Sequence, residues 1–298
     1  MPPGPADSFP VSRSLRVGVV GAGVFGGYHA GKIAGHPRAV LSGVSDPDLP
    51  RARAVGLSHG VGGMTLDTLL AESDAVVVAS PAVTHGEVAV QALEAGRHVL
   101  VEKPLAHTVT WGERVVEAAD GLVLQVGHQE RLVAEAAGLR SLCDITGVEA
   151  WRESPASKRG RDVGVALDLM VHDIDLAHWL LDGEAEDVAG NSNGDVAEAV
   201  FTIDGVPVHL RSSRVAEASR RVMRIHHAGG VAEVDWNAKT VSGAVEGLDP
   251  AFGEREAARD SLGAATDRFV RAVLDGDAPL ASGEDGLRAL RVAAKVEG

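Results

Sequence analysis

The chain has a single cysteine, Cys143, among 298 residues. One cysteine can form no disulfide within the chain and cannot supply a cage of thiolate metal ligands. The histidines outside the helix expected over 165–181 show no ligand spacing with a carboxylate or thiol partner, so no metal site is expected. This cysteine usage suits a reducing compartment, and cytoplasm is the default expectation.

Positive charge and long apolar runs are also scarce. Lys and Arg number 28 against 42 Asp and Glu, which gives a formal net charge of -14. Such a surplus repels nucleic acid and anionic membrane surfaces, so neither is expected as a partner. No segment of the sequence approaches the roughly 20 apolar residues of a membrane span. Residues 1–14 lack the apolar stretch of a signal peptide, and we expect them to form a disordered tail.

Hydrophobic residues make up 45% of the chain, whose length is typical of about two domains. Between residues 15 and 127, short apolar runs alternate with helical patterns. The runs are RVGVVG, VLSGVS, AVVVAS, HVLVE and LVLQVG. This alternation predicts an α/β Rossmann domain over 15–127, with a doubly wound parallel sheet.

Residues 128–298 follow a different pattern. One helix is expected over 165–181, and the stretches EAVFTID, VPVHLRS, RRVMRIHH and VAEVDW follow it with short turns between them. This predicts an α+β domain with an open, mostly antiparallel sheet. An open sheet face favours a homo-oligomer, a dimer or tetramer. The last two helical segments can pack against either domain.

A glycine-rich loop follows the first apolar run. Gly21, Gly23 and Gly26 have G-x-G-x-x-G spacing, and the loop also contains Val24 and Phe25. With 36 glycines in the chain the spacing alone is weak, but the loop stands where a strand gives way to a helix. The N–H groups and positive end of that helix can bind a pyrophosphate, so the loop predicts a dinucleotide site.

Asp46 closes the second apolar run. A carboxylate there can accept hydrogen bonds from the ribose hydroxyls and repels a 2′-phosphate, so NAD is favoured as cofactor. Arg51 and Arg53 lie close by in the sequence and could pair with a phosphate, which keeps NADP as the second choice. Asp46 could also be a simple turn residue before Pro47.

Polar residues end the third and fourth apolar runs. These are Ser80, Glu102 and Lys103, and the carboxyl ends of parallel strands face the ligand crevice. We therefore expect all three to line the cofactor site. His85 begins the next helix, where it either approaches the nicotinamide or caps the helix.

Asp168, His172 and Asp175 fall at i, i+4 and i+7 of the helix expected over 165–181, so they share one face. A carboxylate one turn from an imidazole can fix its tautomer and stabilise its protonated form. His172 is thus a candidate acceptor for an alcohol proton, and Lys103 could hold the oxygen or share the role of base. A surface helix with a salt-bridged polar face is the alternative.

Taken in order, GAGVFG, the strand-end aspartate, EKP, GHQER and the late D-x-x-x-H helix resemble the Gfo/Idh/MocA family of sugar and cyclitol oxidoreductases. The resemblance extends over nearly the whole chain from Arg16. It implies a Rossmann domain joined to an open-faced sheet domain that often serves for oligomerisation. It also implies catalytic roles for Lys103, Asp168 and His172.

Within that family, GHQER and the late helix are most similar to members that oxidise the 3-hydroxyl of UDP-N-acetylglucosamine for later transamination. This implies a nucleotide sugar substrate and an aminotransferase as a pathway partner. The implied substrate contacts are Lys103, His128, Glu130, Arg131, Asp168 and His172. Such members continue from the arginine with an aromatic residue, asparagine and proline, whereas here Leu132, Val133 and Ala134 follow.

The segment RESPASKRGRD brings four cations ahead of the helix, and these could pair with a substrate diphosphate. They are Arg152, Lys158, Arg159 and Arg161. A solvated loop is the alternative. Two other functions stay open: a dehydrogenase of a free sugar, inositol or another cyclic polyol, and a non-catalytic NAD-binding sensor. A sensor needs the glycine loop but no proton acceptor, so Lys103, Asp168 and His172 together argue against it.

Overall fold

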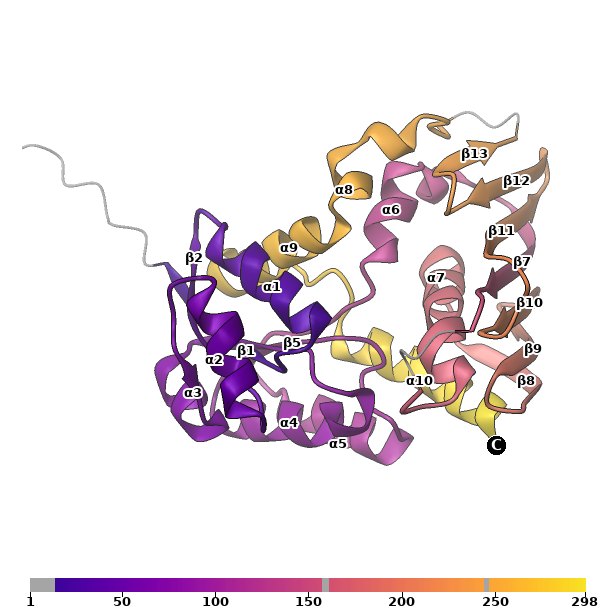
Figure 1. Ribbon diagram of the computed structural model, residues 1–298. Coiled ribbons are helices and arrows are strands. Elements are labelled where there is room, and N and C mark those ends of the chain that lie inside the picture. Colours follow the sequence, from indigo (N-terminus) through magenta and orange to yellow (C-terminus); the bar gives the residue numbers. More distant parts are fainter. Residues whose placement is uncertain (1–13, 157–160, 244–246) are drawn as a thin grey trace, which may run out of the picture.

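The computed structural model describes residues 14–156, 161–243 and 247–298. The tail expected over residues 1–14 therefore lies outside the described residues, apart from Ser14. The chain builds two sheets, one in each half (Figure 1). No helix in the described part is long and apolar enough to cross a membrane.

The first sheet has six parallel strands in the order β3-β2-β1-β4-β5-β6. They are β1 (Leu15–Val20), β2 (Ala39–Ser45), β3 (Gly63–Met64), β4 (Ala75–Val78), β5 (His98–Val101) and β6 (Leu124–Val126). The chain reverses its direction of winding between β1 and β4, and ligands bind at such a switch point. The prediction of a doubly wound parallel sheet is confirmed. The two-residue β3 has no apolar run to predict it.

Five helices connect these strands: α1 (Val24–Ala34), α2 (Leu49–Leu57), α3 (Leu66–Glu72), α4 (Ala82–Glu94) and α5 (Val109–Ala118). The side chains of Asp48, Thr65 and Thr108 cap α2, α3 and α5 by accepting a backbone N–H of the first turn. Helix α1 begins instead after Gly23, which has no side chain to cap it. Its first N–H groups are therefore left for a ligand.

The second sheet has seven strands in the order β13-β12-β11-β7-β10-β9-β8. They are β7 (Ile145–Glu153), β8 (Ala185–Ser192), β9 (Val196–Ile203), β10 (Val206–Ser213), β11 (Arg220–His227), β12 (Gly230–Asp235) and β13 (Thr240–Ser242). Neighbouring strands are antiparallel except β7 and β10, which are parallel. The prediction of a mostly antiparallel sheet is confirmed.

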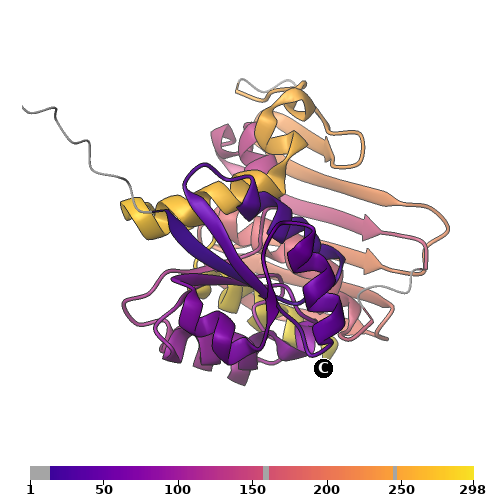
Figure 2. The same ribbon diagram turned by 60° about the vertical axis from the view of Figure 1, so that its left-hand side comes forward.

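The helices of this half are α6 (Glu130–Ala136), α7 (Val171–Leu181), α8 (Glu256–Arg259), α9 (Ser261–Asp275) and α10 (Gly283–Glu297). Two 3₁₀ turns lie at Leu139–Ser141 and Phe252–Glu254, and a π-helical segment, Ala166–Met170, runs directly into α7. Helix α7 covers the side of the sheet that faces the first domain (Figure 1). Figure 2 shows the strands of this sheet side by side behind the first domain. No helix of the described residues covers the other face of the sheet (Figure 1).

The last two helices divide between the domains. Phe269 and Val270 of α9 belong to the core around β1 and β2. Helix α10 packs against α5 and β6 of the first domain and against α7 and β8 of the second. Its buried residues Leu287, Leu290 and Val296 join the core that extends through both halves. The C-terminal helix thus fixes one sheet relative to the other, which positions the site between them.

Candidate dinucleotide and substrate site

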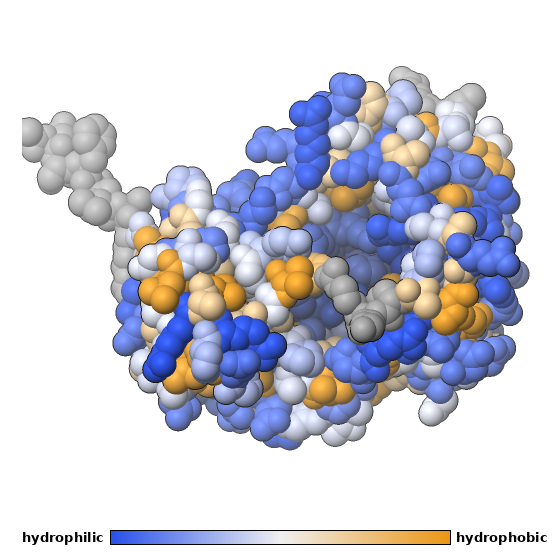
Figure 3. All heavy atoms as spheres, viewed as in Figure 1, coloured by the Kyte–Doolittle hydropathy of each residue, from blue (hydrophilic) through white to orange (hydrophobic). Residues whose placement is uncertain are grey.

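A cavity of about 930 Å³ lies between the two domains at the carboxyl ends of β1, β4 and β5. The space-filling view shows the molecule hollowed there (Figure 3). The residues expected at the cofactor line this cavity, with the exception of Gly26, which packs behind the loop. Those residues are Gly21, Gly23, Val24, Phe25, Asp46, Ser80, His85, Glu102 and Lys103.

The glycine loop has the shape that a dinucleotide pyrophosphate needs. Gly21 has a φ of +102°, and a Cβ there would lie 2.6 Å from the carbonyl oxygen of Ala79. A Cβ on Gly26 would overlap the carbonyl oxygen of Gly21, so only glycine lets α1 approach the loop this closely. A Cβ on Gly23 would meet nothing within 4 Å. The loop leaves open space before the uncapped end of α1, which fits a bound pyrophosphate.

Asp46 stands at the ribose end of the cavity. Its carboxylate accepts the N–H of Ala22 at 2.8 Å and pairs with Arg51 at 2.9 Å. Burial alone would raise the pKa of the Asp46 carboxyl, but these partners and the N–H of Asp48 hold that pKa below its ordinary value. Asp46 therefore supports the turn and also presents an ionised carboxylate. Arg51 lines the cavity beside it, whereas Arg53 lies exposed on α2.

His85 connects two walls of the cavity. It is only 2% exposed, with Nδ1 2.7 Å from the carbonyl oxygen of Pro104 and Nε2 2.9 Å from that of Ser80. Burial lowers the pKa of its imidazole. The N-cap of α4 is Pro81, so His85 does not cap the helix. It holds the loops after β4 and β5 together next to the cofactor site.

Glu102 is anchored from below by a residue that the sequence did not single out. His29 of α1 lies with Nε2 2.8 Å from the Glu102 carboxylate, and both side chains are almost fully buried. Burial alone would raise the pKa of Glu102, but His29 and Lys103 hold it below its ordinary value. This pair ties the glycine-loop helix to the strand end that carries Lys103.

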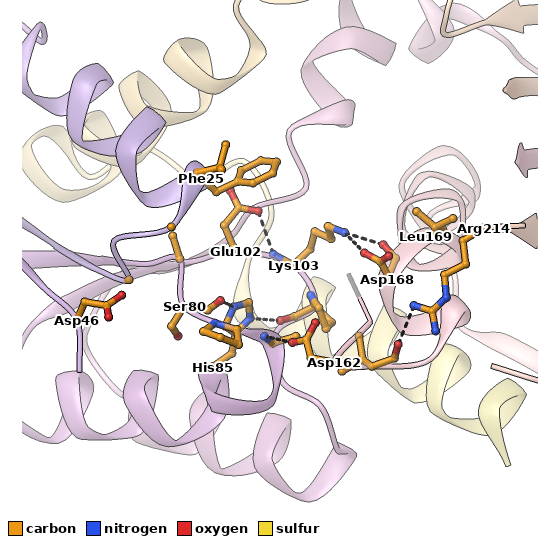
Figure 4. Close-up of a pocket in the computed structure, with 18 of the residues that line it drawn as sticks. Phe25, Asp46, Ser80, His85, Glu102, Lys103, Asp162, Asp168, Leu169 and Arg214 are labelled. Carbon is orange, nitrogen blue, oxygen red and sulfur yellow. Dashed lines mark hydrogen bonds and ion pairs between the residues drawn. The ribbon is translucent and has the colours of Figure 1, made fainter. Parts of the chain in front are cut away.

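Lys103 reaches across the cavity to the second domain. Its Nζ donates to the carbonyl oxygen of Asp168 at 2.6 Å and to the carboxylate Oδ1 of the same residue at 3.0 Å (Figure 4). Each side chain is 19% exposed, so the pair is partly shielded from solvent. The structure thus brings together two of the three residues expected to be catalytic.

His172 lies near this pair, but the structure differs from the expected pairing of Asp168 with His172. Residues Ala166–Met170 form a π-helix, in which the i to i+5 pattern disturbs the spacing of an α-helix. Asp168 turns to Lys103, and the carboxylate beside His172 is Glu130, whose Oε1 lies 3.8 Å from Nδ1. Burial lowers the pKa of His172 well below its ordinary value, which favours the neutral form of the imidazole.

None of the residues of the GHQER segment is among those that line the described cavity. The side chain of Arg131 is 6% exposed and forms two hydrogen bonds with Asp175, at 2.9 and 2.6 Å, and one with Asp285 at 3.3 Å. His128 is 1% exposed and lies 3.7 Å from Asp175. The guanidinium of Arg131 ties α6 to α7 and α10, and a contact of Arg131 with the substrate stays a prediction.

Replacing Arg131 with methionine is expected to lower the free energy of unfolding by about 3–5 kcal/mol, because Asp175 would stay buried without its partner. Urea unfolding followed by circular dichroism measures this. Arg268→Met is the matched control, since its partly exposed pair with Glu135 should contribute at most about 1 kcal/mol. If Arg131→Met had unchanged stability and a raised KM for the sugar, the result would support the predicted contact between Arg131 and the substrate.

The basic segment before the catalytic helix is only partly available for a diphosphate. Lys158 and Arg159 lie outside the described residues. Arg161 is 44% exposed and pairs with Asp195 at 3.3 Å. The prediction that Arg152 could pair with a substrate diphosphate is wrong. Arg152 is buried on β7 and pairs with Glu130 and Asp173.

Arg214 also lines the cavity, although sequence reasoning missed it. Its guanidinium donates to Asp195 and to the carbonyl oxygens of Val163 and Gly194.

Among the described residues, no group of three His, Cys, Asp or Glu side chains is arranged to hold a metal ion.

Comparison with known protein families identifies the family to which this chain belongs. Residues 15–128 match the model described as oxidoreductase family, NAD-binding Rossmann fold, and residues 140–233 match the GFO/IDH/MocA C-terminal domain. The chain belongs to the GFO/IDH/MocA family of oxidoreductases. The resemblance noted in the sequence is therefore confirmed, as is the expectation that the protein is an enzyme.

Two relatives frame the range of substrates in the family. UDP-N-acetylglucosamine 3-dehydrogenase of Acidithiobacillus ferrooxidans is 33% identical over 95% of this chain and 96% of its own length. A solved structure of that enzyme superimposes with a TM-score of 0.85, covering 95% of this chain and 97% of that one. Inositol 2-dehydrogenase 4 of Saccharopolyspora erythraea is 35% identical, but over 58% of this chain and 56% of its own.

A third similar protein bears on the cofactor. GenD2 from gentamicin A biosynthesis, solved in complex with NAD, has a TM-score of 0.80 and 26% identity. The match covers 99% of this chain and 96% of that one.

Proposed function

We propose that this protein oxidises a secondary hydroxyl of a sugar to a ketone with NAD as hydride acceptor. The observation that carries the proposal is the ion pair of Lys103 with Asp168 in the wall of a cavity whose glycine loop fits a dinucleotide. His172 follows Asp168 on the same run of helix. A binding module would need the loop but not this group of proton-transferring side chains.

Each side chain has a role in this reaction. Lys103, held by Asp168, donates a hydrogen bond to the hydroxyl oxygen of the substrate and so positions it for reaction. His172, neutral through burial, takes the hydroxyl proton as the C–O bond becomes a carbonyl. Bound NAD would take the hydride from the carbon that carries this hydroxyl. Gly21, Gly23 and the start of α1 would hold its pyrophosphate.

We propose NAD over NADP because of the charge at the ribose end. Asp46 is ionised and fixed by the N–H of Ala22, so a 2′-phosphate there would meet a negative charge. Arg51 is 54% exposed beside it, but its guanidinium is paired with that same carboxylate. A phosphate would have to compete with Asp46 for this cation.

For the substrate we propose UDP-N-acetylglucosamine, oxidised at its 3-hydroxyl. Support comes from the relative of that activity, which matches 95% of this chain, whereas the inositol dehydrogenase matches little more than half. The diphosphate would find Arg214 in the second-domain wall of the cavity, with Arg161 next to the lining residue Asp162. An inositol or free sugar is the second candidate, because such relatives share the cofactor half at 35% identity.

We also propose a homo-oligomer assembled through the open face of the second sheet. Val200 and Val231 are nearly half exposed on that face, while their neighbours Ala199 and Ala232 are buried on the other. Arg220 covers Trp151 on the outer side at 4.2 Å. An aminotransferase that consumes the ketone would be the pathway partner.

A substrate panel tests the function. Reduction of NAD or NADP is followed at 340 nm with UDP-N-acetylglucosamine, N-acetylglucosamine and myo-inositol. Turnover of the nucleotide sugar with NAD, lost in His172→Ala, is expected. Turnover of myo-inositol alone would show that the proposed nucleotide sugar is not the substrate. Tight NAD binding without turnover of any compound would favour a sensor.

A further inference from the structure

Glu130 stands behind His172, where the sequence led us to expect a substrate contact. Its Oε1 lies 3.8 Å from Nδ1 of His172, and that nitrogen is buried with no hydrogen-bond partner among the described residues. Resting on the proposed function, we infer that Glu130 is a positioning residue that holds His172 in the tautomer able to accept the substrate proton.

The Glu130 carboxylate is itself fixed in place. Arg152 donates to both of its oxygens, at 2.9 and 2.6 Å, and Arg221 donates to Oε1. Arg152 is anchored in turn by two hydrogen bonds of 2.8 Å to Asp173, the residue next to His172. The carboxylate is therefore a rigid reference for the imidazole, because two guanidinium groups restrict its rotation.

This arrangement decides which nitrogen is the base. A proton on Nδ1 directed at Glu130 leaves Nε2 with a free lone pair, which can take the hydroxyl proton. The resulting imidazolium would be stabilised by the carboxylate. A distance of 3.8 Å must shorten by about 1 Å to become a hydrogen bond, as catalytic contacts often do when substrate binds.

The charges around His172 come from several elements. They are Glu130 on α6, Lys103 after β5, His128 after β6, Arg152 on β7 and Arg221 on β11. Burial lowers the pKa of His172, Lys103 and Arg152 lower it further, and Glu130 opposes them. Removing the negative charge of Glu130 should therefore move the pKa of His172 to a still lower value.

The test compares Glu130→Gln with wild type on the best substrate of the panel. We expect kcat to fall on the order of 100-fold with KM nearly unchanged, because an amide can favour the wrong tautomer. The acid limb of the kcat/KM profile should move down by about one pH unit. Glu130→Asp keeps the charge and should recover most of the rate.

A spectroscopic measurement does not depend on turnover. In protein labelled with ¹⁵N-histidine, the signals that His172→Ala removes should show the Nδ1–H tautomer in wild type and lose it in Glu130→Gln. Glu135→Gln is the matched control, since it removes a carboxylate of the same helix, α6, that pairs with Arg268 and takes no part in holding Glu130. Its tautomer and acid limb should stay as in wild type.

Three results would overturn the inference. A raised KM with unchanged kcat in Glu130→Gln would make Glu130 a substrate contact. A fall in the stability of Glu130→Gln that accounts for its loss of rate, with the tautomer and the acid limb unchanged, would make it a structural anchor only. Full activity of His172→Ala would instead refute the proposed proton acceptor, and the inference would fall with it.

Discussion

Lys103→Met should lower kcat by about 10³-fold, the effect of losing a well-placed proton-transfer or polarising group. Methionine has similar length but no charge, so the contact across the cavity to Asp168 disappears while the shape of the wall is kept. The dissociation constant of NAD should change only a few-fold. Initial rates and a fluorescence titration of the cofactor measure the two quantities separately.

Lys32→Met is the control for the loss of a lysine charge. Lys32 pairs with Asp260 at 2.7 Å, but both side chains are about 40% exposed and lie away from the cavity. Its kcat should match wild type. If Lys103→Met kept the wild-type kcat and only raised KM, Lys103 would be a binding group and the chemistry would belong to His172 alone.

Gly26→Ala should weaken dinucleotide binding about 100-fold, because the added methyl group has no space. Its Cβ would overlap the carbonyl oxygen of Gly21, a backbone atom that cannot move without opening the loop. Helix α1 would shift away from β1, and its N–H groups would no longer meet the pyrophosphate. Isothermal titration with NAD measures the loss.

Gly27→Ala, one residue along the same helix, is the control. A Cβ there would meet nothing within 4 Å, so binding should be retained and stability should rise by about 0.5–1 kcal/mol, as alanine favours a helix over glycine. Equal binding by both variants would mean that the close approach of α1 to the loop does not shape the cofactor site.

Much of the first domain could be predicted because its signals are local. Each long apolar run became a parallel strand, and the G-x-G-x-x-G loop fell where strand turns to helix, so Gly21, Asp46 and Lys103 could be placed at one sheet edge. Four strands of the second sheet, β9 to β12, were predicted from alternation and from the short turns between them. The parallel pairing of β7 with β10 was not, because strand order depends on contacts distant in sequence.

The site beyond the cofactor was harder to predict for the same reason. A helical wheel pairs Asp168 with His172, but a π-helical segment redirects Asp168 to a lysine 65 residues away. Neither the link from His29 to Glu102 nor the clamp of Arg152 on Glu130 has a local pattern, since the partners lie 73 and 22 residues apart. Pairs of buried charges such as these join residues that only the folded chain brings together, so no local sequence pattern predicts them.

Transfer of deuterium tests the central claim most directly. The panel substrate that turns over best is prepared with deuterium on the carbinol carbon, for the nucleotide sugar at C3, and the products are analysed by mass spectrometry. We predict one deuterium in the reduced cofactor for each ketone formed, with slower turnover of the labelled substrate. Deuterium released to water, or ketone formed without reduced cofactor, would contradict direct hydride transfer and the role of this site as a dehydrogenase.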